Sequence, residues 1–300
     1  MATLEWVARA VGGRLTGDAV PFASVTQDTR NLQGGALYVA LRGDRFDGHS
    51  FVRRAAALGA AGALVAERCD SALPQVEVDD TLVALQQMAR QWLLGFDTPV
   101  VAVTGSNGKT TVKQMLAAIL GGVGPTLATA GNLNNQIGLP LTLMRLTADH
   151  RFAVLEMGAS KPGDIAELVG IARPQVAIVT HAAAAHLAGF GGLDGVAQTK
   201  GEIYSGLRPG GTAVINADDK LVMQNYESRV KDQRVELFSS KEEGLSGVKF
   251  HQDGTGISFD LAGIGEIRLP ILGGYILGIA RACAIIAKDL GLTDAQIRSG

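Results

Sequence analysis

The sequence predicts an α/β protein: a small N-terminal α/β domain, then a mostly parallel sheet with flanking helices and an antiparallel extension. Three observations support this class. Hydrophobic residues make up 47% of the 300 residues, aromatic residues only 5%, and 39 residues are glycine, a composition typical of α/β domains with tight turns. Short β-branched runs alternate with helical runs along the chain. The clearest example, residues 99–120, reads as a strand, a glycine turn and a helix.

The length of the chain favours two domains, because a single hydrophobic core usually stops growing before this size. We expect a first domain over residues 1–83 and a second over 84–300, with a helix at 81–94 and a hinge at 95–98. Apolar periodicity predicts the other elements of the first domain: a helix at 4–11, a helical segment at 51–59, and strands at 36–41, 63–66 and 76–78.

The second domain begins with the strand that ends at Val103. Further strands are predicted at 152–156, 175–180 and 211–216, and a late helix at 277–290. Short runs at 235–238, 248–251, 256–261 and 266–269 have glycine turns between them, which predicts the antiparallel extension.

The turn after Val103 is suited to binding phosphate. It presents several backbone N–H groups and a helix N-terminus to one point, and Lys109 adds a positive charge there. We expect the nucleotide to contact Gly105, Ser106, Asn107, Gly108, Lys109, Thr110 and Thr111. The hydroxyl of Thr110 or Thr111 is placed to hold a magnesium ion. Because Val103 stands where a standard phosphate loop has its first glycine, a tight turn into a lysine-bearing helix is the alternative reading.

Other polar residues follow the later strands. Glu156 ends a strand, where open α/β sheets bind ligands, and it is a natural second holder of magnesium. His181 and His186 are five residues apart and do not share a helical face, so we do not predict a paired histidine metal site. A single histidine at this strand exit is the better candidate for a metal or phosphate contact. The asparagine-rich stretch 131–136 is either a turn or a set of amides facing a polar ligand.

Composition excludes several functional classes. A formal net charge of −2 gives no general attraction to nucleic acid or acidic lipid. Cys69 and Cys283 lack metal-type spacing and read as reduced core residues. The N-terminus does not resemble a signal peptide, and the apolar stretch 271–287 is too short for a convincing membrane span. We therefore expect a monomeric, cytoplasmic protein with neither nucleic-acid partner nor membrane insertion.

Several stretches, taken in order, resemble the Mur ligases of bacterial cell-wall synthesis. They are DTR at 28–30, LRGDRFDGH at 41–49, VTGSNGKTT at 103–111, GNLNNQIGLPLTL at 131–143, LEMGASKPGDI at 155–165, AAAAHLAGFG at 182–191 and TKGEIY at 199–204. Each stretch is weak evidence alone, but the combination is specific and spans most of the chain.

This resemblance implies an ATP- and Mg²⁺-dependent peptide ligase. Within the family, the chain is most similar to the enzyme that joins D-alanyl-D-alanine to UDP-N-acetylmuramoyl-tripeptide through an acyl phosphate. By the same resemblance, Lys109 and the loop amides hold the β- and γ-phosphates, and Thr110, Glu156 and His186 are associated with metal. Lys200, which reads as a solvated helix lysine by itself, matches a lysine that carbon dioxide converts to a carbamate able to orient a second magnesium.

The resemblance also assigns substrate contacts. Thr29, Arg30, Asp47, Gly48 and His49 match positions that hold the UDP part, and Asn134 and Asn135 match positions facing the substrate and the γ-phosphate. Two departures stand out: the segment 273–277 is Gly-Gly-Tyr-Ile-Leu where the family has polar residues touching adenosine, and His181 stands where we expect asparagine.

The family also has a third, C-terminal domain, which we expect to be absent from these 300 residues. We therefore expect this chain alone to bind the UDP-linked peptide but to turn over poorly. Three alternatives remain: the ligase that adds the third amino acid, a binding module for a UDP-sugar without catalysis, and a generic nucleoside triphosphatase.

Overall fold

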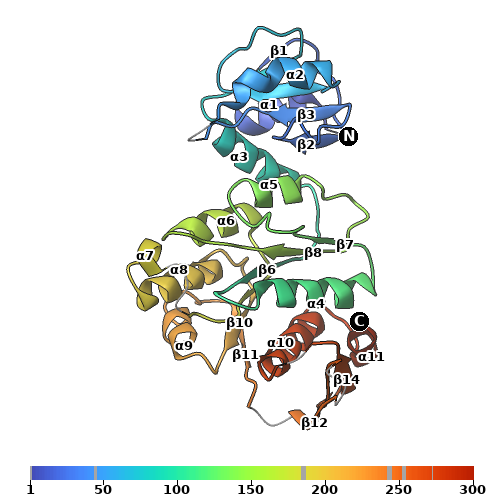
Figure 1. The fold of residues 1–300 in the computed structure, drawn as a ribbon, viewed down its shortest axis with the longest axis vertical. Coiled ribbons are helices and arrows are strands. Elements are labelled where there is room, and N and C mark those ends of the chain that lie inside the picture. The colour runs from blue at the N-terminus through green and yellow to red at the C-terminus, as the bar shows by residue number, and fades with distance from the viewer. Residues whose placement is uncertain (1, 44–45, 184–186, 242–244, 252–254, 272) are drawn as a thin grey trace. The chain divides into compact units, whose positions relative to one another are not determined.

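The computed structural model describes residues 2–43, 46–183, 187–241, 245–251, 255–271 and 273–300. The chain forms two compact units (Figure 1). Unit 1 consists of Met1–Asp97 and Gln136–Leu146, and unit 2 consists of Thr98–Asn135 and Thr147–Gly300. The mixed α/β class predicted from the sequence is confirmed.

Unit 1 contains a five-stranded sheet in the order β1-β5-β4-β3-β2. Its strands are β1 (Arg14–Thr16), β2 (Ser24–Thr26), β3 (Ala36–Val39), β4 (Gly62–Val65) and β5 (Gln75–Glu77). All neighbours are parallel except β1 and β5. Its helices are α1 (Leu4–Val11), the 3₁₀ turn η1 (Gly48–Phe51), α2 (Val52–Ala57), α3 (Thr81–Leu93) and α5 (Gly138–Leu143).

The predicted domain boundary after residue 83 falls inside α3. Leu85 and Met88 of this helix are fully buried in the core of unit 1, so the helix belongs with the N-terminal residues. The division between the units lies after Asp97, within the predicted hinge at 95–98. The sequence pattern also gave no sign that residues 136–146 return to unit 1, where Leu141 joins the core beside α3.

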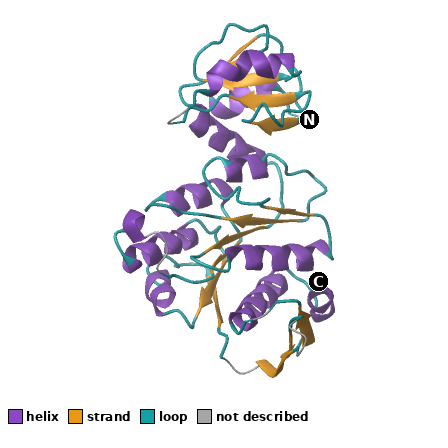
Figure 2. Ribbon diagram, viewed as in Figure 1, coloured by secondary structure: helices purple, strands orange, loops and turns teal. Residues whose placement is uncertain are grey.

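Unit 2 is built on a six-stranded, fully parallel sheet in the order β11-β10-β9-β6-β8-β7. Its strands are β6 (Val100–Thr104), β7 (Thr126–Ala128), β8 (Phe152–Glu156), β9 (Val176–Val179), β10 (Thr212–Asn216) and β11 (Arg234–Phe238). The helices are α4 (Lys109–Gly121), α6 (Asp164–Ala172), α7 (Leu187–Phe190), α8 (Leu193–Ser205), α9 (Lys220–Tyr226), α10 (Tyr275–Asp289) and α11 (Asp294–Ser299). Helices α4 and α10 lie on one face of the sheet and α6 and α8 on the other (Figure 2).

The antiparallel extension differs in one strand from the prediction. β11 pairs in parallel with β10 and forms the edge of the main sheet. The antiparallel part is a separate three-stranded sheet of β12 (Leu245–Phe250), β13 (Ile257–Leu261) and β14 (Gly265–Leu269). Leu261 and Ile264 share one core with α10 and α11, so this sheet is packed onto the helical face that carries α4.

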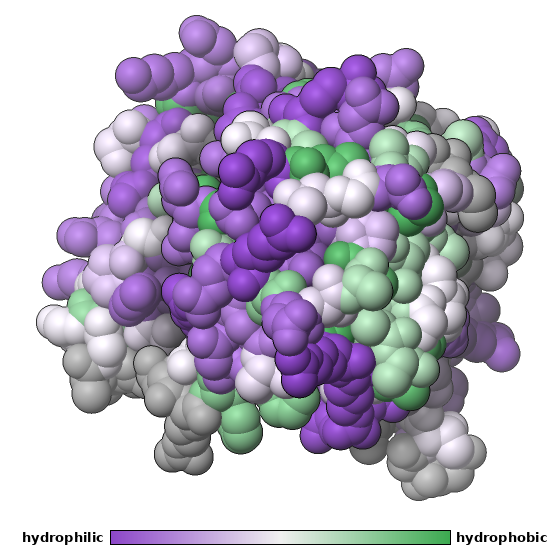
Figure 3. Space-filling view, turned by 90° about the horizontal axis from the view of Figure 1, so that it is seen from above, coloured by the Kyte–Doolittle hydropathy of each residue, from purple (hydrophilic) through white to green (hydrophobic). Residues whose placement is uncertain are grey.

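Hydrophilic and hydrophobic residues both occur at the surface. Figure 3 shows a face on which hydrophilic residues predominate and hydrophobic residues occupy a smaller area. Among the described residues, no helix combines the length and the apolar character needed to span a bilayer.

Candidate functional site

The loop between β6 and α4 is tied to the segment that follows β9. Ser106 N donates to His181 O at 2.7 Å, and Ser106 Oγ donates to Ala183 O at 2.9 Å. Thr180 Oγ1 donates to Asn107 O at 2.5 Å. Gly105 has φ +146°, and a Cβ there would lie 2.0 Å from Thr180 Oγ1. The loop therefore needs glycine at this position and is held in one conformation.

The first turn of α4 is open to an anion. Gly108 precedes it with φ +82° and supplies no side-chain cap. Within the part of the chain that the structure describes, the backbone N–H groups of Lys109, Thr110 and Thr111 have no carbonyl acceptor. Lys109 Nζ donates to Gly105 O at 2.7 Å, and burial lowers the pKa of Lys109 while Glu156 acts in the opposite direction. This set of donors and charge is suited to a polyphosphate.

Glu156, at the end of β8, is the centre of a buried polar cluster. Its Oε2 accepts from Thr110 Oγ1 at 3.0 Å, and its Oε1 accepts from Asn134 Nδ2 at 2.8 Å. Lys113 Nζ lies 3.5 Å from Oε2, and both side chains of this ion pair are almost fully buried. The structure therefore brings the predicted residues Thr110 and Asn134 together at the carboxylate of a third predicted residue, Glu156. Lys113 is the cationic partner of that carboxylate.

These oxygens fit a magnesium ion. A hydroxyl and one carboxylate, completed by phosphate oxygens and water, are the donors that Mg²⁺ prefers. Among the described residues, no group of three or more His, Cys, Asp or Glu could hold a metal ion. Thr110 Oγ1 and Glu156 Oε2 would hold the magnesium ion. His186 lies outside the described residues.

Lys200 is buried on α8, with only 5% of its surface exposed. Its Nζ lies 5.9 Å from the centre of the Phe190 ring. Burial, reinforced by the charge of Lys109 and opposed by Asp164 and Glu202, lowers the pKa of Lys200 to about 8. The expectation of a solvated lysine, taken from the residues alone, therefore does not hold.

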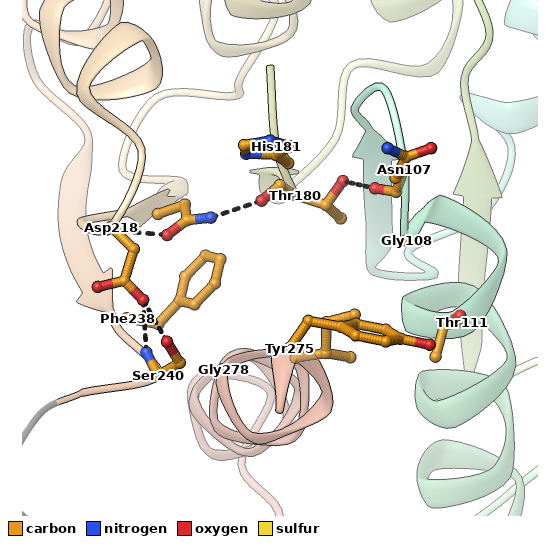
Figure 4. A pocket seen from close by; sticks show the side chains of 12 residues that line it. Asn107, Gly108, Thr111, Thr180, His181, Asp218, Phe238, Ser240, Tyr275 and Gly278 are labelled. Carbon is orange, nitrogen blue, oxygen red and sulfur yellow. Dashed lines mark hydrogen bonds between the residues drawn. The ribbon is translucent and has the colours of Figure 1, made fainter. Parts of the chain in front are cut away.

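A cavity of about 530 Å³ adjoins the loop (Figure 4). Its walls come from the phosphate loop, from the ends of β9, β10 and β11, and from the start of α10. The lining residues are Asn107, Gly108, Thr111, Thr180, His181, Asn216, Asp218, Phe238, Ser240, Tyr275, Gly278 and Ile279. Of the segment 273–277, which departs from the family, only Tyr275 lines the cavity; Ile276 is fully buried and Leu277 packs against the core. The other departure, His181, lines the same cavity.

His181 is held by a buried carboxylate. Its Nδ1 lies 2.6 Å from Asp219 Oδ2, and that oxygen also accepts from Ala182 N at 2.7 Å. Asp219 Oδ1 caps α9 by accepting from Leu221 N and Val222 N. Half of the His181 side chain remains exposed, whereas Asp219 is almost fully buried. The histidine is therefore oriented by its partner and faces the cavity.

The predicted substrate residues in unit 1 gather after β2 and β3, whose parallel carboxyl ends share one edge of the sheet. Tyr38 Oη donates to Gly48 O at 3.0 Å, and burial raises the pKa of Tyr38 to about 12, with Asp28 and Asp47 adding to the rise. The two stretches that contain Arg30 and Asp47 therefore lie close to one tyrosine.

Most of these residues are paired within unit 1. His49 Nδ1 lies 2.5 Å from Asp47 Oδ1, and His49 Nε2 accepts from Ala66 N at 2.8 Å. Arg30 Nη2 donates to Asp28 Oδ2 at 2.7 Å, while Thr29 is buried. A Cβ on Gly48 would lie 2.7 Å from Leu41 O. Asn135 is exposed, in unit 2.

Sequence reasoning missed two buried charged residues that are partners of site side chains, Lys113 and Asp219. Lys113 follows Lys109 by one helical turn and is next to the apolar Val112 in the sequence. A lysine among the buried residues of the helix was the signal that could have indicated a buried ion pair. Asp219 follows β10, but its partner His181 comes from another strand, and the pairing appears only in the folded chain.

Comparisons with known proteins agree with this geometry. Residues 103–287 match the Mur ligase middle domain, and residues 21–92 match the Mur ligase family, catalytic domain. The UDP-N-acetylmuramoyl-tripeptide–D-alanyl-D-alanine ligase of Escherichia coli (strain K12) is 42% identical over 99% of this chain and 67% of its own length. The ligase of the same name from Bacillus subtilis (strain 168) is 36% identical over 99% of this chain and 66% of its length.

Two solved structures are also similar. MurF from Acinetobacter baumannii has a TM-score of 0.89 at 32% identity, covering 99% of this chain and 67% of that one. MurF from Thermotoga maritima in complex with ADP has a TM-score of 0.80 at 29% identity, covering 92% of this chain and 66% of that one. The chain thus spans about two thirds of the length of these relatives. With both regions matched in order, the chain belongs to the Mur ligase family.

Proposed function

We propose that the chain is the nucleotide- and UDP-substrate-binding part of an ATP-dependent ligase that joins D-alanyl-D-alanine to UDP-N-acetylmuramoyl-tripeptide. The observation that carries this proposal is the open first turn of α4 beside Lys109, with Thr110 bonded to the buried Glu156. The names of the relatives, at up to 42% identity, support the choice of substrates. A monomeric, cytoplasmic protein remains the expectation from the sequence.

The proposed reaction has two steps. A carboxylate oxygen of the UDP-linked peptide attacks the γ-phosphorus of ATP, which breaks the bond to ADP and forms an acyl phosphate. The amine of D-alanyl-D-alanine then attacks the acyl carbon, loses a proton, and expels inorganic phosphate. Phosphoryl transfer depends mainly on positioning and charge neutralisation. The loop N–H groups and Lys109 would provide both, once Lys109 leaves its bond to Gly105 O for the phosphates.

Magnesium would be held by Thr110 and Glu156, where it would neutralise charge on the phosphates. We further propose that Lys200 reacts with carbon dioxide, since the lowered pKa leaves more of its amine neutral and nucleophilic near pH 8. The new N–C bond gives a carbamate and releases one proton. This modification would replace a buried cation with an anion near Lys109, as the family resemblance suggests.

In unit 1, the residues after β2 and β3 would bind the UDP part. The neutral tautomer of His49 that donates from Nδ1 to Asp47 and accepts at Nε2 is consistent with both of its contacts. We therefore propose that His49 shapes the turn around Asp47 and Gly48, and that Arg30 and Thr29 act from the neighbouring loop.

Calorimetric titration tests this proposal. The 300-residue chain should bind Mg-ATP and UDP-N-acetylmuramoyl-tripeptide, and the corresponding dipeptide more weakly than the tripeptide. Binding of the UDP ligand without ATP would favour a non-catalytic binding module, for which the apolar Ile279 and the aromatic Tyr275 in the cavity are the supporting observation. A preference for the dipeptide would favour the ligase that adds the third amino acid.

A further inference from the structure

We propose that Lys113 sets how strongly nucleotide binding depends on magnesium. Its buried positive charge lies beside the carboxylate that would hold the metal, so it weakens metal binding and itself supplies part of the charge neutralisation. This inference rests on the proposed function, because it requires a nucleotide with its phosphates at the start of α4. It assigns a role to a side chain that the proposed reaction does not use.

Lys113 and Thr110 reach the same oxygen of Glu156. Thr110 Oγ1 donates to Glu156 Oε2 at 3.0 Å, and Lys113 Nζ lies 3.5 Å from that oxygen. Residues three apart in a helix share a face, so α4 directs both side chains toward the end of β8. A metal ion held by Thr110 and Glu156 would therefore share its carboxylate with the lysine ammonium.

Burial keeps the lysine at this carboxylate. Only 5% of Lys113 and 3% of Glu156 are exposed. Val112 and Leu116, which precede and follow Lys113 on α4, are fully buried. A buried charge without a partner is costly, so the ammonium group is held next to the carboxylate. Its positive charge is therefore a fixed feature of the site.

The charges around the carboxylate favour an anion over a free metal ion. Lys109, Lys113 and Glu156 together carry two positive charges and one negative charge. Burial lowers the pKa of Lys109 and the charge of Glu156 opposes this shift, so the carboxylate also acts on the second lysine. A cation close to a carboxylate lowers the affinity of that carboxylate for a proton by about 10- to 1000-fold. The same repulsion acts on Mg²⁺, which carries two charges.

Hydrogen bonding and stability alone do not account for a lysine at this position. Both oxygens of Glu156 already have neutral donors, Thr110 for Oε2 and Asn134 for Oε1. A buried ion pair is often no more stabilising than apolar side chains of similar volume. What Lys113 adds to these neutral donors is therefore its charge.

The consequence for ligand binding follows from linkage. If magnesium strengthens nucleotide binding by some factor, the nucleotide strengthens magnesium binding by the same factor. The Lys113 charge attracts the phosphates and repels the metal, so it should make this factor smaller. Removal of the charge should weaken metal-free ATP more than Mg-ATP.

Calorimetric titration with ATP tests this inference, once with Mg²⁺ and once with a chelator in its place. The measured quantity is the ratio of the two dissociation constants. Lys113→Gln removes the charge and retains an amide that can donate to Glu156. We expect it to raise the ratio by about tenfold or more, the lower end of the effect of one neighbouring charge. A role in stability alone would weaken both forms of ATP alike and leave the ratio unchanged.

Two controls accompany this variant. Lys113→Arg retains the charge and should keep the ratio of the parent. Lys231→Gln makes the same change of charge at an exposed position and should also keep it. Circular dichroism checks the fold of each protein, and Lys113→Met is a second neutral variant for which we expect the same rise.

An unchanged ratio in a folded neutral variant would overturn the inference while Mg-ATP binding to the parent leaves the proposed function standing. The parent also tests the inference without any variant. If it binds Mg-ATP but shows no detectable binding of metal-free ATP, its lysines do not replace the metal and the inference is wrong. If the parent binds neither form, the proposed function itself fails.

Discussion

The predicted sites of the two units differ in how their polar groups are used. In unit 1, both ring nitrogens of His49 are hydrogen-bonded, one to Asp47 and the other to the backbone N–H of Ala66. The Arg30 guanidinium is paired with Asp28. In unit 2, the first turn of α4 leaves three backbone N–H groups without an acceptor among the described residues, and within the same residues Lys109 Nζ donates only to loop carbonyls. The polar side chains at the predicted site of unit 1 are therefore already held by partners, whereas the loop and helix of unit 2 offer unpaired donors to an anion.

This difference predicts which substitutions should lower stability and which should lower ligand affinity. A residue that is paired within its own unit contributes to folding and shapes the site indirectly. An unpaired donor contributes little to folding and much to ligand affinity. Variants that change stability and affinity in different proportions can therefore test this distinction, and Lys113 is expected to give the largest effect.

Lys113→Met should lower the free energy of unfolding by about 3 kcal/mol, because it leaves the buried Glu156 carboxylate without its cationic partner. Urea denaturation measures this loss. The matched double variant Lys113→Met/Glu156→Met should recover most of it, since replacing both members of a buried pair by apolar groups is often nearly neutral. A single variant as stable as the parent would show that the pair is not formed in solution.

Lys109→Met should weaken Mg-ATP by about 100-fold, as expected for loss of hydrogen bonds to a charged group, with little change in stability. The reason is that, among the described residues, Lys109 Nζ donates only to carbonyls of its own loop. Calorimetry with Mg-ATP and with the UDP-linked tripeptide separates the two units, because only the first ligand should be affected. Lys231→Met, at an exposed position, is the control. Equal loss of both ligands would contradict the comparison.

Lys200→Met should stabilise the protein by about 1 to 2 kcal/mol at pH 7, because a buried charge is removed. The folded-state pKa of about 8 lies below the usual 10.5, so between these values the unfolded chain binds more protons and parental stability rises with pH. The advantage of the variant should therefore shrink as pH increases from 8 to 10. Urea denaturation in carbon dioxide-free buffer measures this, and an advantage independent of pH would contradict it.

His49→Ala should cost about 1 kcal/mol or slightly more, because the Ala66 N–H loses its acceptor. It should also weaken the UDP-linked ligand while leaving Mg-ATP unchanged. Ser50→Ala, on the same turn but exposed, should have a smaller effect on stability. If His49→Ala weakens the UDP ligand without destabilising the protein, the histidine is a direct contact and the contrast between the units is less sharp.

Local patterns predicted the elements that depend on neighbouring residues. The stretch 99–120 forms β6, the loop and α4, and the predicted strands at 152–156 and 211–216 correspond to β8 and β10. The order of strands and the placement of β11 could not be read this way, because parallel pairing joins residues far apart in the chain. The short β1 and β2, of three residues each, have too few positions to show an alternation.

The same distinction between local patterns and contacts between distant segments explains which site residues could be predicted. Gly108 and Lys109 lie in one local motif, so their role as a phosphate loop could be hypothesised from sequence. Lys113 with Glu156 and His181 with Asp219 are contacts between different elements. Their partners cannot be assigned from spacing along the chain, even where a buried lysine or a lone histidine draws notice.

The return of residues 136–146 to unit 1 has a consequence for synthesis of the protein. A nascent chain that has emerged only as far as Asp97 lacks α5, so the part of α3 that contacts it stays uncovered. Unit 1 can complete its core only after about fifty further residues, including β6 and α4 of the other unit, have left the ribosome. A truncated protein designed to isolate unit 1 should therefore include residues 136–146. Without them, the apolar face of α3 is exposed and the protein should aggregate.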